Sequence, residues 1–357
     1  MNRAFAKDIA VEIDFPEERE GLVYVDVTKP PFKLHGVYLE DGLLRRAPEA
    51  VAAATSENVC RLAKNTAGGR VRFSVKGTSC LKLHVESPDP EWTWHISPGT
   101  GTFGIDLYKN GSFNQITFPY KDDYTFGRWW GEDEEPVLTL NLPISRKISK
   151  LLIGVEEGAE IIEAPDYSLK KPIVFYGSSI TQGLCATRPG MTYENILSRR
   201  LDFDYINLGF SGSAKGEDAI AEYIAGLDMS IFVYDYDHNA PNPEYLRETH
   251  EKMFLKIREA QPDLPILMLS RPRPKNRNTG DVAARQAVVR ETYENALARG
   301  DKNVYFIPGT DLIKDEIGDD WSVCGTHPTD LGFFSMADAI APTLKKLIDQ
   351  VKERGIE

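Results

Sequence analysis

The chain has 357 residues, a hydrophobic fraction of 41% and a formal net charge of -12 at pH 7. This length exceeds one typical domain and the apolar content is sufficient for packed cores, so we expect two folded domains. Nucleic acids and anionic membranes are bound by basic surfaces, so we expect neither as a partner of this acidic chain. The first residues contain no apolar leader and no apolar run approaches membrane-spanning length, which favours a cytoplasmic protein.

The cysteines show no pattern of a disulfide framework or a metal site. Four are present, widely separated and without a Cys-x-x-Cys pair: Cys60, Cys80, Cys185 and Cys324. We expect the first three to be free, buried thiols. The run from Asp235 to His238 resembles a metal cluster, but neighbouring residues at a strand end point in alternating directions. We therefore expect no metal and no cofactor.

The amino-terminal half has the pattern of a β-sandwich. Short β-forming runs, several with strict alternation, lie at residues 22–27, 70–75, 81–85, 137–142 and 151–155. Such strands, separated by Gly, Pro and Asn, are typical of two packed antiparallel sheets. Residues 43–54 are an exception and predict one short helix. We predict a β-sandwich domain over residues 1–164, a linker near residues 163–171, and a second domain over residues 172–357.

A glycine-rich segment in this half matches the dinucleotide fingerprint. Gly99-Thr-Gly-Thr-Phe-Gly104 fits the GxGxxG pattern. That fingerprint needs a helix directly after it, whereas residues 105–111 continue as a strand and a turn. We therefore reject a dinucleotide site.

Four of the five tryptophans lie close together in the same half: Trp92, Trp94, Trp129 and Trp130. Aromatic rings with acidic neighbours are a common way to hold a sugar, because the ring face stacks on C–H groups. Tryptophans also fill the core of a sandwich or its contact with another domain. Both interpretations stay open at this point.

The carboxy-terminal half alternates strands with helices. Strands are predicted at residues 173–176, 205–210, 230–234, 265–269 and 304–308, and helices at 217–227, 243–260, 280–299 and 329–354. Such alternation predicts a parallel sheet with helices on both faces. In the last helix, six apolar residues at helical spacing are expected to pack on the sheet: Leu331, Phe334, Met336, Ile340, Leu344 and Leu347.

Polar residues follow successive strands of this half. Ser178 and Ser179 follow the first strand, Gly212 the second and Asn239 the third, and His327 precedes the last helix. The carboxyl ends of parallel strands meet at one edge of a sheet, so these residues can lie close together. A serine beside a histidine and backbone donors is suited to ester hydrolysis, because it supplies a nucleophile, a proton carrier and oxyanion donors.

These segments resemble the blocks of the SGNH, or GDSL-like, hydrolases. Residues 177–183 are similar to the first block, 207–212 to the second and 327–332 to the last, while 236–239 keeps only the asparagine of the third. In addition, Gly104-Ile-Asp-Leu-Tyr108 resembles the GxDLY signature of an amino-terminal β-domain that is fused to such hydrolases. The resemblance implies a flavodoxin-like, doubly wound parallel sheet preceded by the β-sandwich domain.

The resemblance also implies roles for single residues. Ser179 matches the nucleophile position, with Ser178 as its local competitor, and His327 matches the general base. The oxyanion donors would be the backbone N–H groups of Ser179 and Gly212 and the side-chain amide of Asn239. Residues nearby are expected to contact the substrate: Ser178, Gln182, Arg188, His238 and the four tryptophans.

One position departs from the pattern of the family. Its last block carries an aspartate three residues before the histidine, and this chain has Cys324 there. A neutral thiol is a weak acceptor and does not stabilise an imidazolium as a carboxylate does. Three interpretations stay open: Asp319 or Asp320 replaces the acid, a backbone carbonyl orients His327 in a Ser–His dyad, or the site is impaired.

Three hypotheses for the function follow. The first is a serine esterase that removes O-acetyl groups from sugars or oligosaccharides through an acyl-enzyme, favoured by the fused β-domain and the tryptophans. The second is a short-chain acyl or lysophospholipid esterase, and the third, motivated by Cys324, is a carbohydrate-binding pseudoenzyme. A homo-oligomer is compatible with all three.

Overall fold

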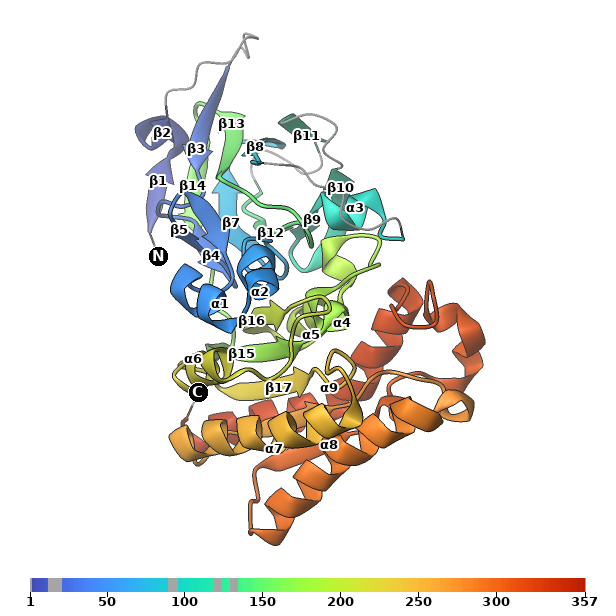
Figure 1. Ribbon diagram of the computed structural model, residues 1–357. Helices are drawn as coiled ribbons and strands as arrows, with labels where there is room; N and C mark the ends of the chain where they lie inside the picture. The colour runs from blue at the N-terminus through green and yellow to red at the C-terminus, as the bar shows by residue number, and fades with distance from the viewer. Residues whose placement is uncertain (1, 12–20, 89–95, 118–122, 129–133, 357) are drawn as a thin grey trace. The chain divides into compact units, whose positions relative to one another are not determined.

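The structure of the chain is a computed structural model that describes residues 2–11, 21–88, 96–117, 123–128 and 134–356 (Figure 1). It divides into two compact units. The first consists of Met1–Arg46, Lys64–Asp166 and Arg188–Gly190, and the second of Ala47–Ala63, Tyr167–Thr187 and Met191–Glu357. Each unit therefore takes residues from separate parts of the chain.

The first unit contains two antiparallel sheets. The larger has the order β1 (Arg3–Phe5), β14 (Glu160–Glu163), β7 (Arg70–Lys76), β12 (Val137–Asn141), β9 (Ile105–Lys109) and β10 (Ser112–Thr117), with β4 (Lys33–His35) also on β7. The smaller has the order β11 (Asp123–Arg128), β8 (Cys80–Glu86), β13 (Lys150–Glu156), β3 (Leu22–Asp26) and β2 (Ala10–Val11). The predicted β-sandwich is confirmed.

Alternating apolar residues explain why these strands form a sandwich. Val71 and Phe73 on β7 are fully buried and pair in register with Leu140 and Leu138 on β12. These side chains share one hydrophobic cluster with Leu83 on β8, which belongs to the other sheet. The period-2 pattern thus places one face of each sheet in a common core.

The rejected dinucleotide pattern has a simple local structure. A four-residue helix, α3 (Gly99–Thr102), covers its first glycines, and strand β9 (Ile105–Lys109) follows directly. The segment after the glycines is therefore a strand, as the sequence analysis predicts.

The single helix predicted at residues 43–54 is wrong for its first part. Residues Leu43–Arg45 form strand β6, which pairs with β5 (Tyr38–Glu40), and helix α1 (Glu49–Thr55) begins only after Pro48. Helix α2 (Glu57–Leu62) follows directly and was not predicted. Both helices belong to the second unit, where they share a hydrophobic cluster with α6 (Asp218–Ala225).

The second unit is built on a parallel sheet. Its five strands have the order β16 (Phe203–Gly209), β15 (Leu169–Gly177), β17 (Ile231–Asp235), β18 (Ile266–Leu269) and β19 (Val304–Ile307). In chain order this is 2-1-3-4-5, the flavodoxin-like arrangement, whose topological switch point lies between the first and third strands. The predicted fold is confirmed.

Helices cover both faces of this sheet. Val174 and Tyr176 of β15 join the cluster that includes α1, α6, α7 (Pro243–Ala260) and α8 (Gly280–Ala298). On the alternate face, the ring of Phe175 contacts that of Tyr193 on α5 (Tyr193–Leu201) at 5.8 Å between centroids. Helix α5 in turn packs on α9 (Asp330–Arg354). Figure 1 shows α7 and α8 side by side.

The last helix corrects part of the predicted core. Leu331 and Phe334 are 48% and 45% exposed, whereas Met336, Ile340 and the later members of the predicted set are buried. The buried face of the helix includes Phe333, Met336 and Ile340, and residues 331 and 334 lie outside it. Phe334 instead lies beneath the guanidinium of Arg200, 4.5 Å from its ring centroid.

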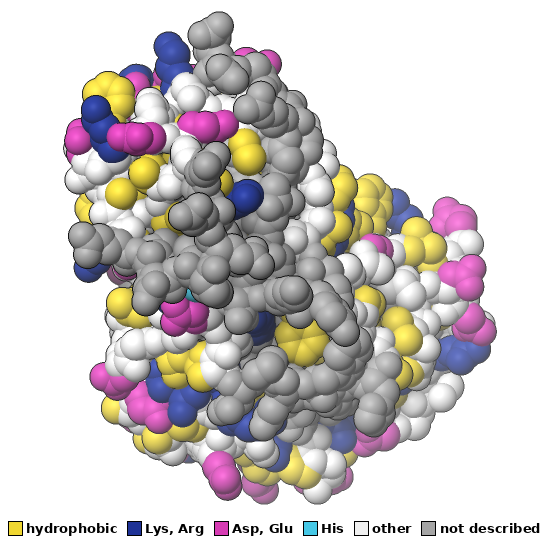
Figure 2. Space-filling view, turned by 90° about the horizontal axis from the view of Figure 1, so that it is seen from above, with side chains coloured by type: hydrophobic (Ala, Val, Ile, Leu, Met, Phe, Trp, Pro, Cys, Tyr) yellow, Lys and Arg dark blue, Asp and Glu magenta, His cyan; other side chains and the backbone are white. Residues whose placement is uncertain are grey.

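The thiols and the surface complete the description. All four cysteines are thiols outside any disulfide; Cys185 is buried as expected, but Cys60 and Cys80 are only partly buried. On the described part of the face seen in Figure 2, acidic, basic and apolar side chains are interspersed. Within the described residues, no helix combines the length and hydropathy that a membrane-spanning segment needs.

Candidate active site

The segment that carries the candidate nucleophile is a tight strand-to-helix turn. Strand β15 ends at Gly177, and the short helix α4 (Ser179–Gln182) begins at once. The Ser178 hydroxyl accepts a hydrogen bond from the Ile180 N–H at 3.1 Å and so caps this helix. The hydroxyl of Ser178, the alternative candidate for the nucleophile, is therefore engaged in the cap. Ser179 is 5% exposed and directs its hydroxyl to a histidine.

The two residues predicted to perform the chemistry lie together. The Oγ atom of Ser179 is 2.9 Å from the Nε2 atom of His327, although 148 positions separate them in the chain. His327 lies in a loop closed by an antiparallel bridge between Ser322 and Pro328, and Thr329 caps the following helix α9. Such a distance lets an imidazole accept the proton of a serine hydroxyl.

The buried side chain of Asp235 holds the nucleophile turn in place by hydrogen bonds. Asp235, at the end of β17, accepts hydrogen bonds from the Thr181 hydroxyl and, at 3.4 Å, from the Ser178 N–H. A Cβ atom at Gly177 would overlap this carboxylate, so glycine is required there by close approach. Burial raises the pKa of Asp235 to about 8. The sequence analysis missed this role, because the strand end alone does not tell where the carboxylate points.

The loops after β16 and β17 bring the two other expected oxyanion donors to the same edge. The Asn239 side-chain amide donates to the Phe210 carbonyl at 3.1 Å, and the Phe210 N–H donates to the Gly177 carbonyl at 2.8 Å. Gly212, two residues after Phe210, has φ of +67, and a Cβ there would meet nothing within 4 Å. Backbone conformation, rather than close packing, therefore accounts for glycine at 212.

Gln182, expected to contact the substrate, has a structural contact in this arrangement. Its side chain is buried, and its Oε1 accepts a hydrogen bond from the Ser211 N–H at 3.0 Å. The glutamine therefore braces the loop that carries Gly212.

Cys324 occupies the side of the imidazole that faces away from the serine. Its Sγ atom is 3.3 Å from the Nδ1 atom of His327. The two aspartates considered as substitutes are exposed and lie elsewhere: Asp319 pairs with Arg277 at 2.6 Å, and the Asp320 carbonyl accepts from the Thr329 hydroxyl at 2.8 Å. The structure does not bring either carboxylate to the imidazole.

The surroundings of His327 disfavour its protonated form. The residue is 6% exposed. Burial, and then the nearby His238 and Arg271, lower the pKa of His327 to about 4. At neutral pH the imidazole is therefore uncharged and able to accept a proton.

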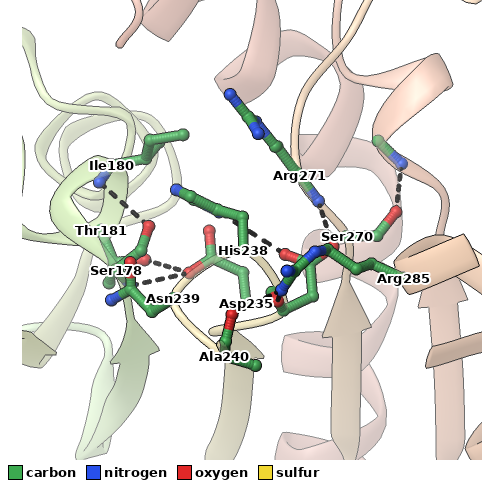
Figure 3. A network of polar contacts seen from close by, with 12 residues as sticks. Ser178, Ile180, Thr181, Asp235, His238, Asn239, Ala240, Ser270, Arg271 and Arg285 are labelled. Carbon is green, nitrogen blue, oxygen red and sulfur yellow. Dashed lines mark hydrogen bonds and ion pairs between the residues drawn. The ribbon is translucent and has the colours of Figure 1, made fainter. Parts of the chain in front are cut away.

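His238 lies in the polar network of this edge (Figure 3). Its side chain is 8% exposed, its Nδ1 is 3.6 Å from the Asp237 carboxylate, and neither ring nitrogen is within hydrogen-bond distance of a partner among the described residues. Burial lowers the pKa of His238.

Arg285, on α8, donates to the Asp237 and Ala240 carbonyls at 2.7 Å and so fixes the loop after β17. Among the described residues, no group of His, Cys, Asp or Glu is placed to hold a metal.

Arg188 is anchored in the first unit by the GxDLY motif. It donates to the Asp106 carboxylate at 3.0 Å and to the Tyr108 hydroxyl at 2.5 Å. Asp106 is fully buried and also accepts from the Gly190 N–H at 2.8 Å and from Asn141 at 2.7 Å. The motif therefore holds the segment Arg188–Gly190. The four tryptophans expected to contact a sugar lie outside the described residues.

Comparison with known families and structures agrees with this geometry. The model of the GDSL-like lipase/acylhydrolase family matches residues 170–345, and that of the GxDLY amino terminus of SGNH-hydrolase-type esterases matches residues 22–161. The chain belongs to the GDSL-like, or SGNH, hydrolases. The predicted family is confirmed, including its branch with a GxDLY domain, and membership of this family supports an esterase or hydrolase activity.

Solved structures extend this assignment. The chain is similar to a protein from Bacteroides ovatus solved as a GDSL-like lipase, with 28% identity, a TM-score of 0.81, and coverage of 92% of this chain and 98% of that one. It shares its fold with the salicylyl-acyltransferase SsfX3 of a tetracycline biosynthetic pathway (20%, TM-score 0.75) and a family two carbohydrate esterase from Cellvibrio japonicus (13%, TM-score 0.63), each over 92% of this chain and 98% of that one. None of the curated proteins matches the chain.

Proposed function

We propose that this GDSL-like hydrolase is a serine esterase that removes O-acetyl groups from acetylated sugars or oligosaccharides. The observation that carries the proposal is the 2.9 Å contact between the Ser179 hydroxyl and His327 Nε2, at the switch point of the sheet. Asn239 and Gly212 lie on the loops that flank this point.

The proposed reaction has two halves. The Ser179 oxygen attacks the acetyl carbonyl carbon while His327 Nε2 takes the hydroxyl proton, and the oxyanion accepts hydrogen bonds from the Ser179 and Gly212 N–H groups and the Asn239 amide. The intermediate collapses, the sugar oxygen leaves with the proton from His327, and acetyl-Ser179 remains. Water then attacks this ester, gives its proton to His327, and releases acetate and the free serine.

Two observations support a sugar as the alcohol. The first unit is a β-sandwich with the GxDLY motif, and several similar structures are carbohydrate esterases. They include an acetyl xylan esterase from Butyrivibrio proteoclasticus, 14% identical, with a TM-score of 0.61 and coverage of 92% of this chain and 99% of that one. The sequence identity of these structures to the chain is low, and a shared fold does not define a substrate. The sugar substrate is therefore part of our proposal.

The test is an assay of the wild type beside Ser179→Ala. Acetylated oligosaccharides are incubated with each, and mass spectrometry follows the loss of acetyl groups, while 4-nitrophenyl esters of two to twelve carbons report chain-length preference. We expect the wild type to release acetate, to prefer the acetyl ester, and to lose this activity with Ser179→Ala. Rising activity with chain length would instead identify a lipid-type esterase.

A carbohydrate-binding pseudoenzyme is the second candidate, and Cys324 in place of the expected acid is the observation that favours it. It predicts equal, background rates for the wild type and Ser179→Ala on every ester. The same assay therefore separates the two functions.

A further inference from the structure

We propose that the ester substrate carries a carboxylate, and that the guanidinium groups of Arg271 and Arg273 bind this anion beside the imidazole of His327. This inference rests on the esterase function proposed above and adds the charge of the substrate to it.

Both arginines are attached to the loop that presents the general base. They follow strand β18, whose carboxyl end lies at the same edge of the sheet as the nucleophile turn. Arg271 donates to the Thr326 hydroxyl at 2.5 Å, and Arg273 donates to the Gly325 carbonyl at 2.8 Å. These partners are the two residues directly before His327. The guanidinium groups therefore lie next to the place where an ester must bind.

Neither guanidinium forms an ion pair with a carboxylate in the part of the chain that the structure describes. Both side chains are partly buried, and the Nε atoms of Arg271 and Arg273 are buried with no hydrogen-bond partner among the residues that the structure describes. Arg285, by contrast, has Asp281 at 2.6 Å. A guanidinium keeps its charge when it is buried, and removal from water is costly unless an anion offsets it.

The carboxylate of Asp237 is nearby but is engaged by other groups. Its Oδ2 accepts the main-chain N–H of Arg271 at 3.0 Å, and its Oδ1 faces the ring of His238 at 3.6 Å. The two guanidinium groups are hydrogen-bonded to consecutive residues of one loop, Arg271 to Thr326 and Arg273 to Gly325. Guanidinium groups are suited to bind a planar carboxylate.

An anion here would also assist the reaction. The transition state places a positive charge on His327, and Cys324 replaces the carboxylate that would stabilise it. Burial, His238 and Arg271 all disfavour that charge. A substrate carboxylate held by the arginines would offset the positive field. We therefore expect a charged ester to react faster than its neutral analogue, as well as to bind more tightly.

His238 gives an independent indication of a polar ligand. Its side chain is more than nine-tenths buried, its Nδ1 faces the Asp237 carboxylate at 3.6 Å, and its Nε2 has no hydrogen-bond partner within the described residues. In Figure 3, the side chains of His238 and Arg271 extend beyond the ends of the strands. A buried ring nitrogen without a partner is costly unless a ligand supplies one. The edge of the sheet thus offers a further donor or acceptor beside the two guanidinium groups.

The experiment compares matched esters that differ only in charge. The first pair is mono-(4-nitrophenyl) succinate and its methyl ester, which places the carboxylate on the acyl group. The second is O-acetylated galacturonic acid and its methyl ester, which places it on the alcohol. We expect kcat/KM to favour the charged member of one pair by roughly 10- to 100-fold, the range of a charge-assisted contact. The pair that responds identifies the side that carries the anion.

Variants assign the preference to the arginines. Arg271→Gln and Arg273→Gln remove the charge but keep a donor amide, and we expect each to reduce the charged-to-neutral ratio toward one, with Arg271→Lys retaining part of it. Arg258→Gln is the matched control. Arg258 also donates to main-chain carbonyls, but it is paired with Asp301 at 2.7 Å. We expect this variant to lower stability and leave the ratio unchanged.

Two results would overturn the inference while the esterase function stands. One is equal kcat/KM for both members of both pairs, in a wild type whose activity depends on Ser179. The other is a charge preference that both glutamine variants retain. If no ester is cleaved, calorimetry of succinate, galacturonate and galactose decides: a lack of charge-dependent binding to the wild type, or its persistence in Arg271→Gln, rejects the anion site.

Discussion

The Sγ atom of Cys324 lies 3.3 Å from the Nδ1 atom of His327, on the side of the ring opposite Ser179. When Nε2 accepts the serine proton, Nδ1 carries its own hydrogen and directs it to the sulfur. A thiol accepts this hydrogen weakly, so it can orient the ring while adding little stabilisation of the imidazolium. The cysteine thus occupies the position of an acid without supplying the full charge of one.

The first prediction concerns Cys324→Asp. A carboxylate at this position favours the protonated imidazole, so we expect the pKa of His327 to rise from about 4 toward its ordinary range. The acid limb of the kcat/KM profile should shift to higher pH with this pKa, and the rate at neutral pH should be kept or raised. Stopped assays between about pH 3 and pH 9 measure both effects.

Cys324→Ser serves as the control, because it retains a small polar group without a charge. We expect its acid limb to stay near that of the wild type. A complete loss of activity in Cys324→Asp, with an unchanged melting temperature, would show that the thiol has a role of its own.

The second prediction concerns Asn239→Ala. If the amide stabilises the oxyanion, its removal costs about 3–4 kcal/mol in the transition state, so kcat should fall by roughly 10²- to 10³-fold with little change in KM. Asn242→Ala is a matched control from the same loop. Its side chain caps α7 by accepting the Tyr245 N–H at 2.8 Å, so this change should lower stability but leave kcat largely intact. An increase of KM alone would assign Asn239 to ground-state binding.

The third prediction concerns Asp235 and pH. Its folded pKa of about 8 lies above the ordinary value, so the folded state binds this proton more tightly than the unfolded state. The resulting stability is complete below about pH 4 and is lost as the pH rises through about 8. Asp235→Asn keeps an oxygen for Thr181 and Ser178 but cannot ionise. Melting temperatures measured across this range should therefore fall less steeply with pH in the variant, and an unchanged slope would contradict the assignment.

The fourth prediction concerns the GxDLY motif. Asp106→Ala leaves buried donors of Asn141, Arg188 and Gly190 without their acceptor, and each such group costs about 1–3 kcal/mol. We expect a loss of roughly 3 kcal/mol or more in urea unfolding. Tyr108→Phe, which removes a single hydroxyl contact with Arg188, should cost far less. Similar losses for both would indicate that Asp106 is not the main anchor of this segment.

The sequence was sufficient to predict the site residues that lie at strand ends or at a fixed spacing from one another. Ser179 and His327 could be paired because strand ends of a parallel sheet converge, and Cys324 could be placed opposite the serine by its spacing from His327. Asp235, Arg271 and Arg273 were not assigned roles, because a polar residue at a strand end gives no information on the direction of its side chain. Whether the site performs the proposed reaction stays a prediction.

The same limit applies to the fold. Alternation was sufficient for the central strands β3, β7, β8, β12 and β13, but not for short strands such as β1, β2 and β4. Helical spacing was sufficient for α7, which was predicted with its observed bounds of Pro243–Ala260. The predicted helix merged α1 with the strand before it, and α2 was not predicted. The reason is that Pro48 and Ser56 divide a short apolar run into separate elements. Their packing on α6 was not predicted either, since an apolar stripe does not specify which core it joins. Leu331 and Phe334 were assigned to the core for a related reason: near the start of a helix, several stripes fit equally well.

Residues 47–63 belong to the second unit although they precede most of the first unit in the chain, so a single cut does not separate the two units. A fragment that starts at the linker would retain the serine and the histidine, but it would lack Val59 and Leu62, which are buried in the same hydrophobic cluster as Ile220 and Ile224. Exposing that apolar surface favours aggregation. The hydrolase half is thus not a cassette that can be excised or exchanged at one junction, and gene fusions or chimeras need to inherit both stretches together.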